Sequence, residues 1–453
     1  MYDQVITDGL IITPSEAYQA DLAIQRDRIV AIGRGLTGRQ MISAAGLYVL
    51  PGAVDPHVHL AMDAGVTRTS EDWASGTIAA ACGGTTTVID FVEPDLDGPL
   101  APALAARRGE AEAGAVIDFG LHMTLRSAAP EVLAEVPAIM AAGCSSFKTY
   151  LTYDGFRLDD RSFLEALTAV AQVGGLALVH AENDAAISAL RAEAVARGDR
   201  APRFHALTRP AATEAEAIER AVTLAGVAGC RLYVVHVSTR PGAEAVARAR
   251  VRGQAVTGET CPQYLLLTED ELSRPGFEGA KFVCSPPLRP ADHPPALWRH
   301  LASGALSTVG TDHCAFFFDG QKTLGQESFT AIPNGLPGIE ARLALLHTLG
   351  VREGRLSLQR WVEVCCAAPA QTFGLYPHKG TLMPGADADV VLFDPEREVV
   401  LDRAVLHERT DYTPYAGLQL RGYPVLTMAR GEVIVREGEF QGAPGRGRFL
   451  PRL

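Results

Sequence analysis

The chain has 453 residues, of which 47% are hydrophobic and 21% charged, and its formal net charge is −12 at pH 7. Such a composition can bury a large core and excludes a disordered chain, and the acidic balance argues against a nucleic-acid-binding surface. The length suits one large domain with a smaller satellite, or two to four small domains.

The N-terminus carries no recognisable targeting segment. Residues 1–4 lack the basic region of a secretory signal, and no apolar run is long enough to span a bilayer. The eight cysteines are scattered and include no Cys-x-x-Cys pair, which is typical of buried thiols in a reducing compartment. We therefore expect a cytoplasmic protein that has no membrane partner.

Both ends of the chain contain short segments in which apolar and polar residues alternate, with turn residues between them. These segments are 5–7, 10–12, 21–24, 28–33, 388–393 and 425–435. Neither end has enough strands to close a core of its own. We predict that residues 1–50 and 373–440 pair into one small β-sandwich, followed by a flexible C-terminal arm over residues 441–453.

Residues 51–372 alternate strand-like apolar runs with alanine-rich helical stretches, a pattern typical of a parallel α/β domain. Helices are expected, for example, over residues 71–82, 131–142, 161–173 and 241–252. The eight predicted strands end near His59, Phe91, Thr124, Tyr150, His180, Val237, Thr260 and Asp312. Eight strand–helix units in about 320 residues suit a (β/α)8 TIM barrel. A doubly wound sheet is the alternative, but no Gly-x-Gly-x-x-Gly turn follows any strand.

Chemically active residues stand at the ends of five of these strands, and the strand ends of a barrel meet at one face. His57 and His59 are two positions apart, so in a strand their side chains point to the same side. The other candidates, each at the end of a later strand, are Lys148, His180, His236 and Asp312. Their nitrogen and oxygen atoms are ligands that Zn²⁺ and similar ions prefer.

Taken singly, each of these residues has an ordinary structural explanation as a core histidine, a helix cap or a surface lysine. Their joint occurrence at one rim favours a metal site over coincidence. Lys148 is the unusual member, because an ammonium beside two metal cations is strongly disfavoured. It fits such a site only if its charge is removed.

Longer motifs resemble the dihydropyrimidinase/D-hydantoinase family, which are cyclic amidohydrolases of the amidohydrolase superfamily. The resemblance covers nearly the whole chain. It implies hydrolysis of the cyclic amide or imide bond of dihydropyrimidines or 5-substituted hydantoins to N-carbamoyl amino acids. The motifs that carry it include Asp55-Pro56-His57-Val58-His59, Ser146-Phe147-Lys148, His180-Ala181-Glu182-Asn183, Cys284-Ser285-Pro286-Pro287, Gly310-Thr311-Asp312-His313 and Ile332-Pro333-Asn334-Gly335.

The resemblance also implies two Zn²⁺ ions per subunit, bridged by an N6-carboxylated Lys148. By that pattern one ion is held by His57, His59 and Asp312, and the other by His180 and His236.

The same resemblance implies roles for residues around the ring substrate. Asp312 would move the catalytic proton, and Tyr153 would donate to the developing oxyanion. Ser285 and Asn334 would bind the ring through backbone atoms.

Alternatives within the superfamily differ in substrate or in activity. Dihydroorotases typically carry an arginine two residues after the second histidine, whereas this chain has Ala61, which can bind no carboxylate. An allantoinase or another cyclic-amide hydrolase stays open, as does a non-catalytic scaffold relative, although all six ligand positions are filled here. The resemblance implies a homotetramer that acts on a small molecule.

Overall fold

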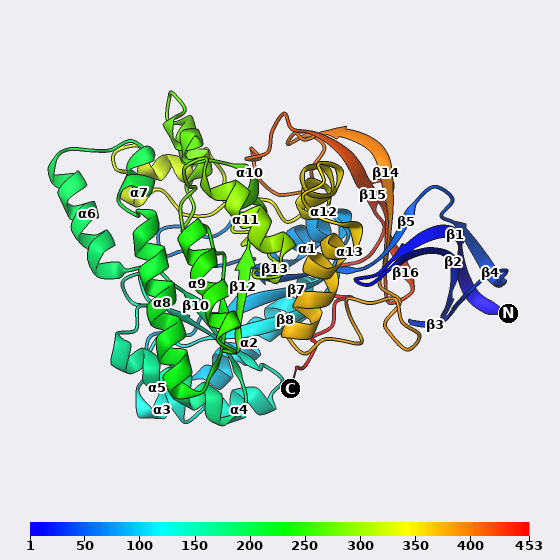
Figure 1. The fold of residues 1–453 in the computed structure, drawn as a ribbon, viewed down its shortest axis with the longest axis horizontal. Coiled ribbons are helices and arrows are strands. Elements are labelled where there is room, and N and C mark those ends of the chain that lie inside the picture. The colour runs from blue at the N-terminus through cyan, green and yellow to red at the C-terminus, as the bar shows by residue number, and fades with distance from the viewer. Residues whose placement is uncertain (453) are drawn as a thin grey trace.

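The computed structural model describes residues 1–452 and has two parts, a central barrel and a sheet built from both ends of the chain (Figure 1). Eight parallel strands form the barrel, and their order in space follows their order in the chain. This arrangement confirms the predicted (β/α)8 architecture. The barrel strands are β6 (Ala53–Val58), β7 (Thr85–Val92), β8 (Asp118–Thr124), β9 (Ser146–Tyr150), β10 (Leu176–His180), β11 (Arg231–Val234), β12 (Val256–Thr260) and β13 (Thr308–Val309).

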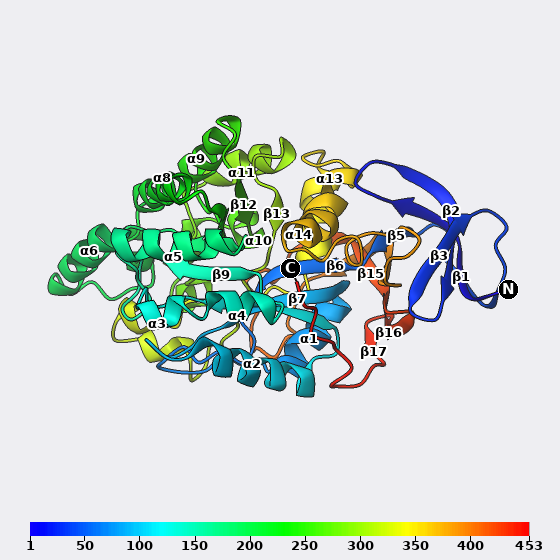
Figure 2. The same cartoon turned by 90° about the horizontal axis from the view of Figure 1, so that it is seen from below.

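Helices surround the barrel strands, as the view from below shows (Figure 2). Several begin at a side chain that accepts a hydrogen bond from the free backbone N–H groups of the first turn, as Asp72, Asp159 and Thr239 do. The predicted helix over 131–142 is two shorter helices, since Pro137 has no N–H with which to continue the first.

The α-helices are α1 (Trp73–Cys82), α2 (Leu100–Gly114), α3 (Pro130–Leu133), α4 (Val136–Ala141), α5 (Asp160–Gln172), α6 (Asp184–Ala196), α7 (Arg203–Leu207), α8 (Ala211–Ala228), α9 (Arg240–Val251), α10 (Pro262–Leu266), α11 (His293–Ala302), α12 (Arg342–Leu346), α13 (Leu358–Val362) and α14 (Ala368–Thr372).

The barrel closes where β6 meets the segment that follows β13. The backbone N–H of His59 donates to the carbonyl of His313 at 2.8 Å. Thr311 donates to the carboxylate of Asp55 from its backbone N–H at 3.1 Å and from its hydroxyl at 2.7 Å. The buried Arg342 donates to one carbonyl on each of the two strands, at 3.0 and 2.7 Å. The first and last strands of the barrel, which lie far apart in the chain, are thereby fixed side by side.

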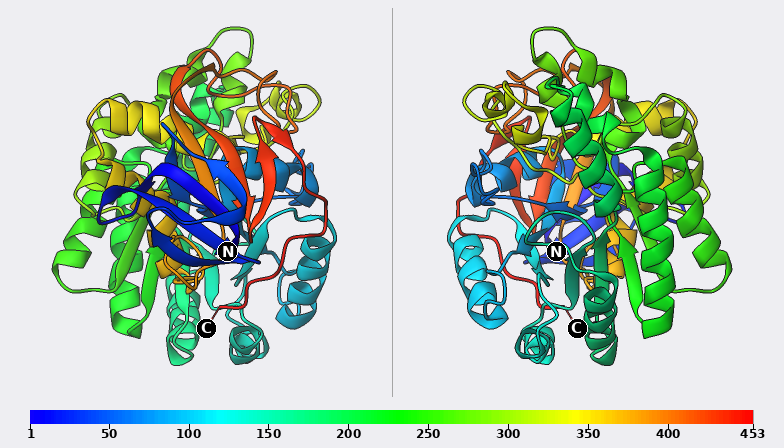
Figure 3. Two further views of the ribbon diagram at one scale, coloured as in Figure 1. Left: turned by 90° about the vertical axis from the view of Figure 1, so that its right-hand side faces the viewer. Right: turned by 90° about the vertical axis from the view of Figure 1, so that its left-hand side faces the viewer.

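Strands from the two ends of the chain form one nine-stranded mixed sheet, seen in front of the barrel in the left view of Figure 3. Antiparallel pairing of Leu50 with Val391 joins the two ends, and Ile11, Ile24 and Met428 lie in their shared core. The predicted pairing of the ends is confirmed. The strands are β1 (Tyr2–Ile12), β2 (Ala17–Gln25), β3 (Arg28–Gly33), β4 (Gly38–Ser43), β5 (Tyr48–Pro51), β14 (Val390–Val400), β15 (Gln419–Ala429), β16 (Glu432–Arg436) and β17 (Glu439–Phe440). The proposed domain boundaries stay predictions.

The segment after β17 differs from the flexible arm that its glycines predict, because its described part packs along the barrel (Figure 3). Gly447 N–H donates to the carbonyl of Ala115 at 2.9 Å, and Leu450 N–H donates to that of Phe119 at 2.8 Å. The side chain of Arg452 is fully buried. Backbone hydrogen bonds of this kind leave no pattern in the sequence, which explains the difference.

The eight cysteines, all in the described part of the chain, are free and buried, as their scattered positions predict. They serve the core as small apolar side chains. Within residues 1–452, no helix is both long enough and apolar enough to cross a membrane.

A buried cluster of charges connects the barrel to the terminal sheet. Asp118, at the start of β8, accepts from the ammonium of Lys379 at 2.6 Å and also pairs with Arg430, which follows β15. Lys379 in turn lies 2.8 Å from both Asp387 and Asp389. Because these groups are removed from water, each depends on its partners to offset the cost of desolvation.

Replacing Asp118 with Asn is expected to lower the free energy of unfolding by about 3–5 kcal/mol, since it removes the buried anion that pairs with both Lys379 and Arg430. Urea unfolding of both proteins measures the difference. Glu112→Gln, which removes an exposed ion pair with Arg108 on α2, is the matched control and is expected to cost less than about 1 kcal/mol. If both variants lost the same free energy of unfolding, the stabilising role of the buried charge cluster would be contradicted.

Candidate active site

A cavity of about 1040 Å³ opens at the carboxyl ends of the barrel strands. Its volume exceeds what a small ring needs, so it has room for a ring with a substituent. Every residue that the sequence predicts for the site lines this one cavity: His57, His59, Lys148, Tyr153, His180, His236, Ser285, Asp312 and Asn334.

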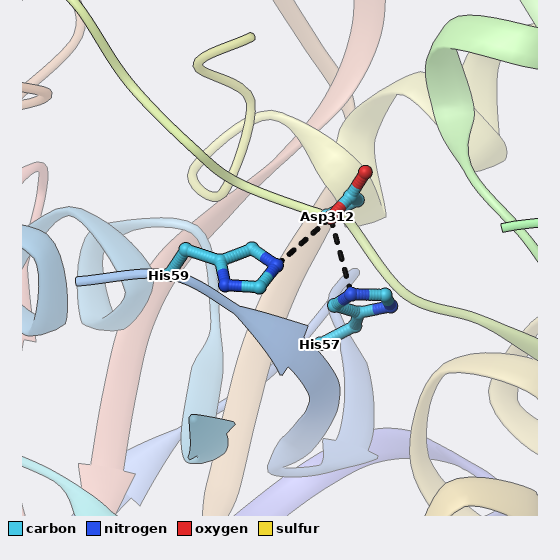
Figure 4. Close-up of side chains that lie close together, drawn as sticks. All are labelled: His57, His59 and Asp312. Carbon is cyan, nitrogen blue, oxygen red and sulfur yellow. Dashed lines mark ion pairs between the residues drawn. The ribbon is translucent and has the colours of Figure 1, made fainter. Parts of the chain in front are cut away.

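His57, His59 and Asp312 form the most compact group on the cavity floor (Figure 4). One carboxylate oxygen of Asp312 lies 3.1 Å from Nε2 of His57 and 3.3 Å from Nε2 of His59. The histidines come from the end of β6 and the aspartate from the segment after β13. The closure of the barrel is therefore what brings them together. One candidate ligand atom from each residue lies within 4.8 Å of the others, a spacing that suits a single metal ion.

Two further imidazoles and the predicted lysine lie next to this group. The ring centroids of His180 and His236 are 4.6 Å apart, and those of His236 and His57 are 5.5 Å apart. The buried ammonium of Lys148, on β9, is 5.0 Å from the ring centroids of Phe91 and of Tyr150. All six predicted ligand residues are thus neighbours, as the barrel geometry requires.

Burial sets the protonation of these groups. It lowers the pKa of His57 and His236 well below the ordinary histidine value and also lowers the pKa of His180. These imidazoles are therefore neutral at pH 7, the state in which a ring nitrogen can bind a metal. Burial would raise the pKa of Asp312, but His57 and the hydrogen bond from His59 outweigh it, so the carboxylate stays ionised.

Burial also lowers the pKa of Lys148 to about 8. A substantial fraction of this side chain is then a neutral amine near physiological pH, unlike an exposed lysine. The unusual member of the predicted ligand set therefore lies in a place where loss of its charge is favoured.

The residues present fit a divalent metal ion. Nε2 of His57 and Nδ1 of His59 are buried, and neither has a hydrogen-bond partner among residues 1–452. Buried polar atoms without a partner are rare in folded proteins. Imidazole nitrogens that lie beside an ionised carboxylate are the donor set that zinc and related metals bind.

Glu259, at the end of β12, orients the imidazole of His57 and fixes the backbone of His236, a role that was not predicted from the sequence. Its Oε1 accepts from Nδ1 of His57 at 2.7 Å and from the backbone N–H of His236 at 2.9 Å. The first bond leaves Nε2 of His57 free to face the cavity. A glutamate next to the predicted strand end at Thr260 was the sequence signal that could have identified it.

Glu182 plays the same part for His180. Its Oε2 lies 2.7 Å from Nε2 of His180 and accepts from Arg209 at 2.6 Å. Burial would raise the pKa of Glu182, but Arg209 and His180 outweigh it and hold that pKa at about 2. The guanidinium of Arg209 also lies 5.3 Å from the ring centroid of Tyr153, so one cation contacts both the Glu182 carboxylate and the Tyr153 ring.

Tyr153, His236 and Asp312 share an unusual backbone conformation. Their φ angles of 79°, 39° and 52° lie in the left-handed region, which residues other than glycine rarely adopt. Such conformations persist where the surrounding structure enforces them, and they concentrate at functional sites. Burial raises the pKa of Tyr153, so its phenol keeps the proton that it can donate into the cavity.

Lys322 fixes the two segments that carry Ser285 and Asn334. Its buried ammonium donates to the carbonyls of Val283 at 2.7 Å, Pro333 at 2.7 Å and Gly335 at 2.8 Å. One side chain thereby connects the loop before Ser285 to the turn around Asn334. A lysine in a loop is usually exposed, so the sequence offered no signal for this role.

Lys322→Met keeps the volume and removes the three hydrogen bonds. Because it leaves buried carbonyls without donors, we expect the free energy of unfolding to fall by at least about 2 kcal/mol, measured by urea unfolding. Lys281→Met, at a partly exposed lysine paired with Glu278, is the control and should cost less than about 1 kcal/mol. An unchanged stability of Lys322→Met would contradict this account.

Comparisons with known proteins agree with this fold and show the family. The sequence model of the amidohydrolase family matches residues 48–434, so the chain belongs to the amidohydrolase family. The chain is 46% identical to the D-hydantoinase of Streptomyces coelicolor, over 99% of this chain and 97% of that protein. It is also 46% identical to the D-hydantoinase of Geobacillus stearothermophilus, over 99% and 96% of the two chains.

Solved structures show the same similarity. A D-hydantoinase crystal structure matches with a TM-score of 0.98 and 44% identity, covering 99% of each chain. The dihydropyrimidinase of Brevibacillus agri NCHU1002 matches with a TM-score of 0.98 and 42% identity, covering 99% of this chain and 98% of that one. The resemblance seen in the sequence motifs is thereby confirmed.

Proposed function

We propose that this protein is a metal-dependent cyclic amidohydrolase, which opens the ring of 5-substituted hydantoins or dihydropyrimidines to give N-carbamoyl amino acids. The observation that carries the proposal is the meeting of His57, His59 and Asp312 on the floor of a cavity large enough for a substituted ring. Its similarity to hydantoinases and a dihydropyrimidinase along its full length supports this ring class over allantoin.

In this proposal two Zn²⁺ ions occupy the cavity floor. His57, His59 and Asp312 would hold one ion, and His180 and His236 would hold the other. Lys148 would bridge the two after carboxylation by CO₂, which turns an ammonium into an anion, and its lowered pKa supports this because only the neutral amine reacts. When bound, such a metal pair supplies an activated water at neutral pH and a Lewis acid for the carbonyl.

The chain's own residues would handle the protons and the developing charge. Asp312, which stays ionised, would accept the proton of the attacking water and return it to the ring nitrogen as the C–N bond breaks. The protonated Tyr153 would donate to the oxyanion that forms at the attacked carbonyl. Backbone groups of Ser285 and Asn334 would pair with the ring N–H and C=O groups.

Features of the cavity weigh against the alternatives. Ala61 lines it and can bind no carboxylate, which disfavours dihydroorotate as the substrate. A scaffold relative without activity has no need of six ligand residues gathered on one floor. The homotetramer and the cytoplasmic location stay predictions, and light scattering of the purified protein tests the first.

Ring opening by the zinc-loaded protein on dihydrouracil, phenylhydantoin and allantoin tests the function, with bicarbonate present so that Lys148 can be carboxylated. We expect turnover of the first two and none of allantoin. The ratio of kcat/KM for the first two ranks dihydropyrimidinase against hydantoinase activity. If the protein binds two metal ions but opens none of the three rings, the proposed substrate class is refuted.

Lys148→Ala is expected to lose more than about 100-fold in activity and to bind fewer metal ions, because the bridging anion is gone. A short carboxylate such as acetate at high concentration should restore part of the activity by filling the same space with an anion. Lys148→Arg keeps the charge, cannot be carboxylated and leaves no space, so it should not be rescued. Elemental analysis reports the metal content, and full activity of either variant would disprove the role.

A further inference from the structure

Glu93 is a carboxylate in the cavity wall that the proposed reaction does not use. It follows β7 and stands two residues after Phe91, whose ring is stacked 4.7 Å from that of His59. Positions two apart in extended chain point to the same side, so the Glu93 side chain also faces the cavity, one step further from its floor. Glu93 lines the cavity and is half-buried there.

This carboxylate has little polar support of its own. Within residues 1–452 its one hydrogen-bond partner is the phenol of Tyr150, whose oxygen is 3.5 Å from Oε1, at the outer limit of a hydrogen bond. Burial raises the pKa of Glu93 and outweighs the opposing charges of His59, Arg126 and Lys148, none of which forms an ion pair with it. A positive or hydrogen-bond-donating group in the cavity would offset that cost.

The arginines of the cavity wall are already engaged within the protein. Arg126 donates to the carbonyls of Gly155 at 2.9 Å and Pro94 at 3.0 Å, and its guanidinium is stacked 4.1 Å from the ring centroid of Phe156. Arg68 donates to a backbone carbonyl at 3.0 Å.

A third arginine of the wall, Arg107, pairs with Asp90 at 2.6 Å. Asp95 and Asp154 also line the wall and add to its negative charge. These arginines of the wall therefore have hydrogen-bond partners within the protein, whereas the carboxylates of Glu93, Asp95 and Asp154 form no ion pair among residues 1–452.

Apolar side chains also line this cavity. Met62, Ala64 and Val66 come from the loop after β6, and Ile332 and Phe156 from two other loops. A substituent on the ring would therefore find both apolar surface and the Glu93 carboxylate in the same cavity.

We propose that Glu93 determines specificity by favouring rings whose 5-substituent is an alkyl stem that ends in a cationic or hydrogen-bond-donating group. The inference rests on the proposed function and names its substrate class more closely. A charge-assisted hydrogen bond between a partly buried carboxylate and an ammonium is stronger than one between neutral groups. Hydantoins that correspond to basic amino acids would accordingly be better substrates than neutral ones of equal length.

Three matched substrates test this inference: 5-(4-aminobutyl)hydantoin, 5-pentylhydantoin and 5-(3-carboxypropyl)hydantoin, which carry a cation, no charge and an anion on similar stems. We expect the kcat/KM of the wild-type protein to be about ten-fold or more higher for the cationic than for the neutral substrate, and lowest for the anionic one. Higher ionic strength should narrow this preference, since salt screens the partly exposed pair.

Glu93→Gln should bring the ratio of cationic to neutral kcat/KM close to one, whatever happens to the absolute rates. Asp97→Asn, an exposed carboxylate in the same loop that does not line the cavity, is the matched control and should keep the wild-type ratio. If Glu93→Gln does not fold, the salt dependence of the wild-type ratio still decides the question.

The outcomes separate the two proposals. Turnover of 5-pentylhydantoin with no cation preference, or a preference that Glu93→Gln and salt leave unchanged, overturns the role of Glu93 and leaves the proposed function intact. Failure to open any of the three rings, together with failure on dihydrouracil and phenylhydantoin, refutes the proposed function itself.

Discussion

The whole site depends on the closure of the barrel between β6 and the segment after β13. The hydrogen bond from His59 N–H to the carbonyl of His313 fixes the register of this junction. One residue earlier, Asp312 then lies beside His57 and His59, although more than 250 positions separate them in the chain. Because a parallel strand can form only one register with its neighbour here, the ligand geometry follows from the backbone. The buried Arg342 also stabilises the junction, because it donates a hydrogen bond to a carbonyl of each of the two strands.

Desolvation organises the chemistry on this floor. It keeps the imidazoles neutral and moves Lys148 towards its neutral form, whereas neighbouring histidines keep Asp312 ionised. Metal ligands need these states, and in water only the carboxylate and a fraction of the imidazoles would have them. The carboxylates of Glu182 and Glu259 behind the imidazoles hold the ring orientations that burial alone leaves open.

The cavity has a rigid floor and a wall made of loops. The floor is fixed by strands and by the left-handed backbone at His236 and Asp312, whereas the wall is assembled from loops that single side chains connect. Lys322 fixes the two loops that face the ring, and Arg126 connects the loop that carries Glu93 to the loop around Gly155. Reaction and ring recognition thus depend on the framework, and the choice of substituent depends on loop residues such as Glu93.

The sequence by itself predicts the barrel, the pairing of the two chain ends and the six ligand candidates, because strand periodicity places reactive side chains at strand ends. Three further residues that line the cavity, Tyr153, Ser285 and Asn334, were predicted only from the family resemblance. The sequence-based prediction misassigned the C-terminal segment and left Lys322, Arg209 and Glu259 without roles. These depend on backbone carbonyls and on partners remote in the chain, which no local pattern records. Only the tertiary structure decided which charges are left without a cation, as at Glu93, because the free energy of a buried charge depends on every neighbour that packing brings near.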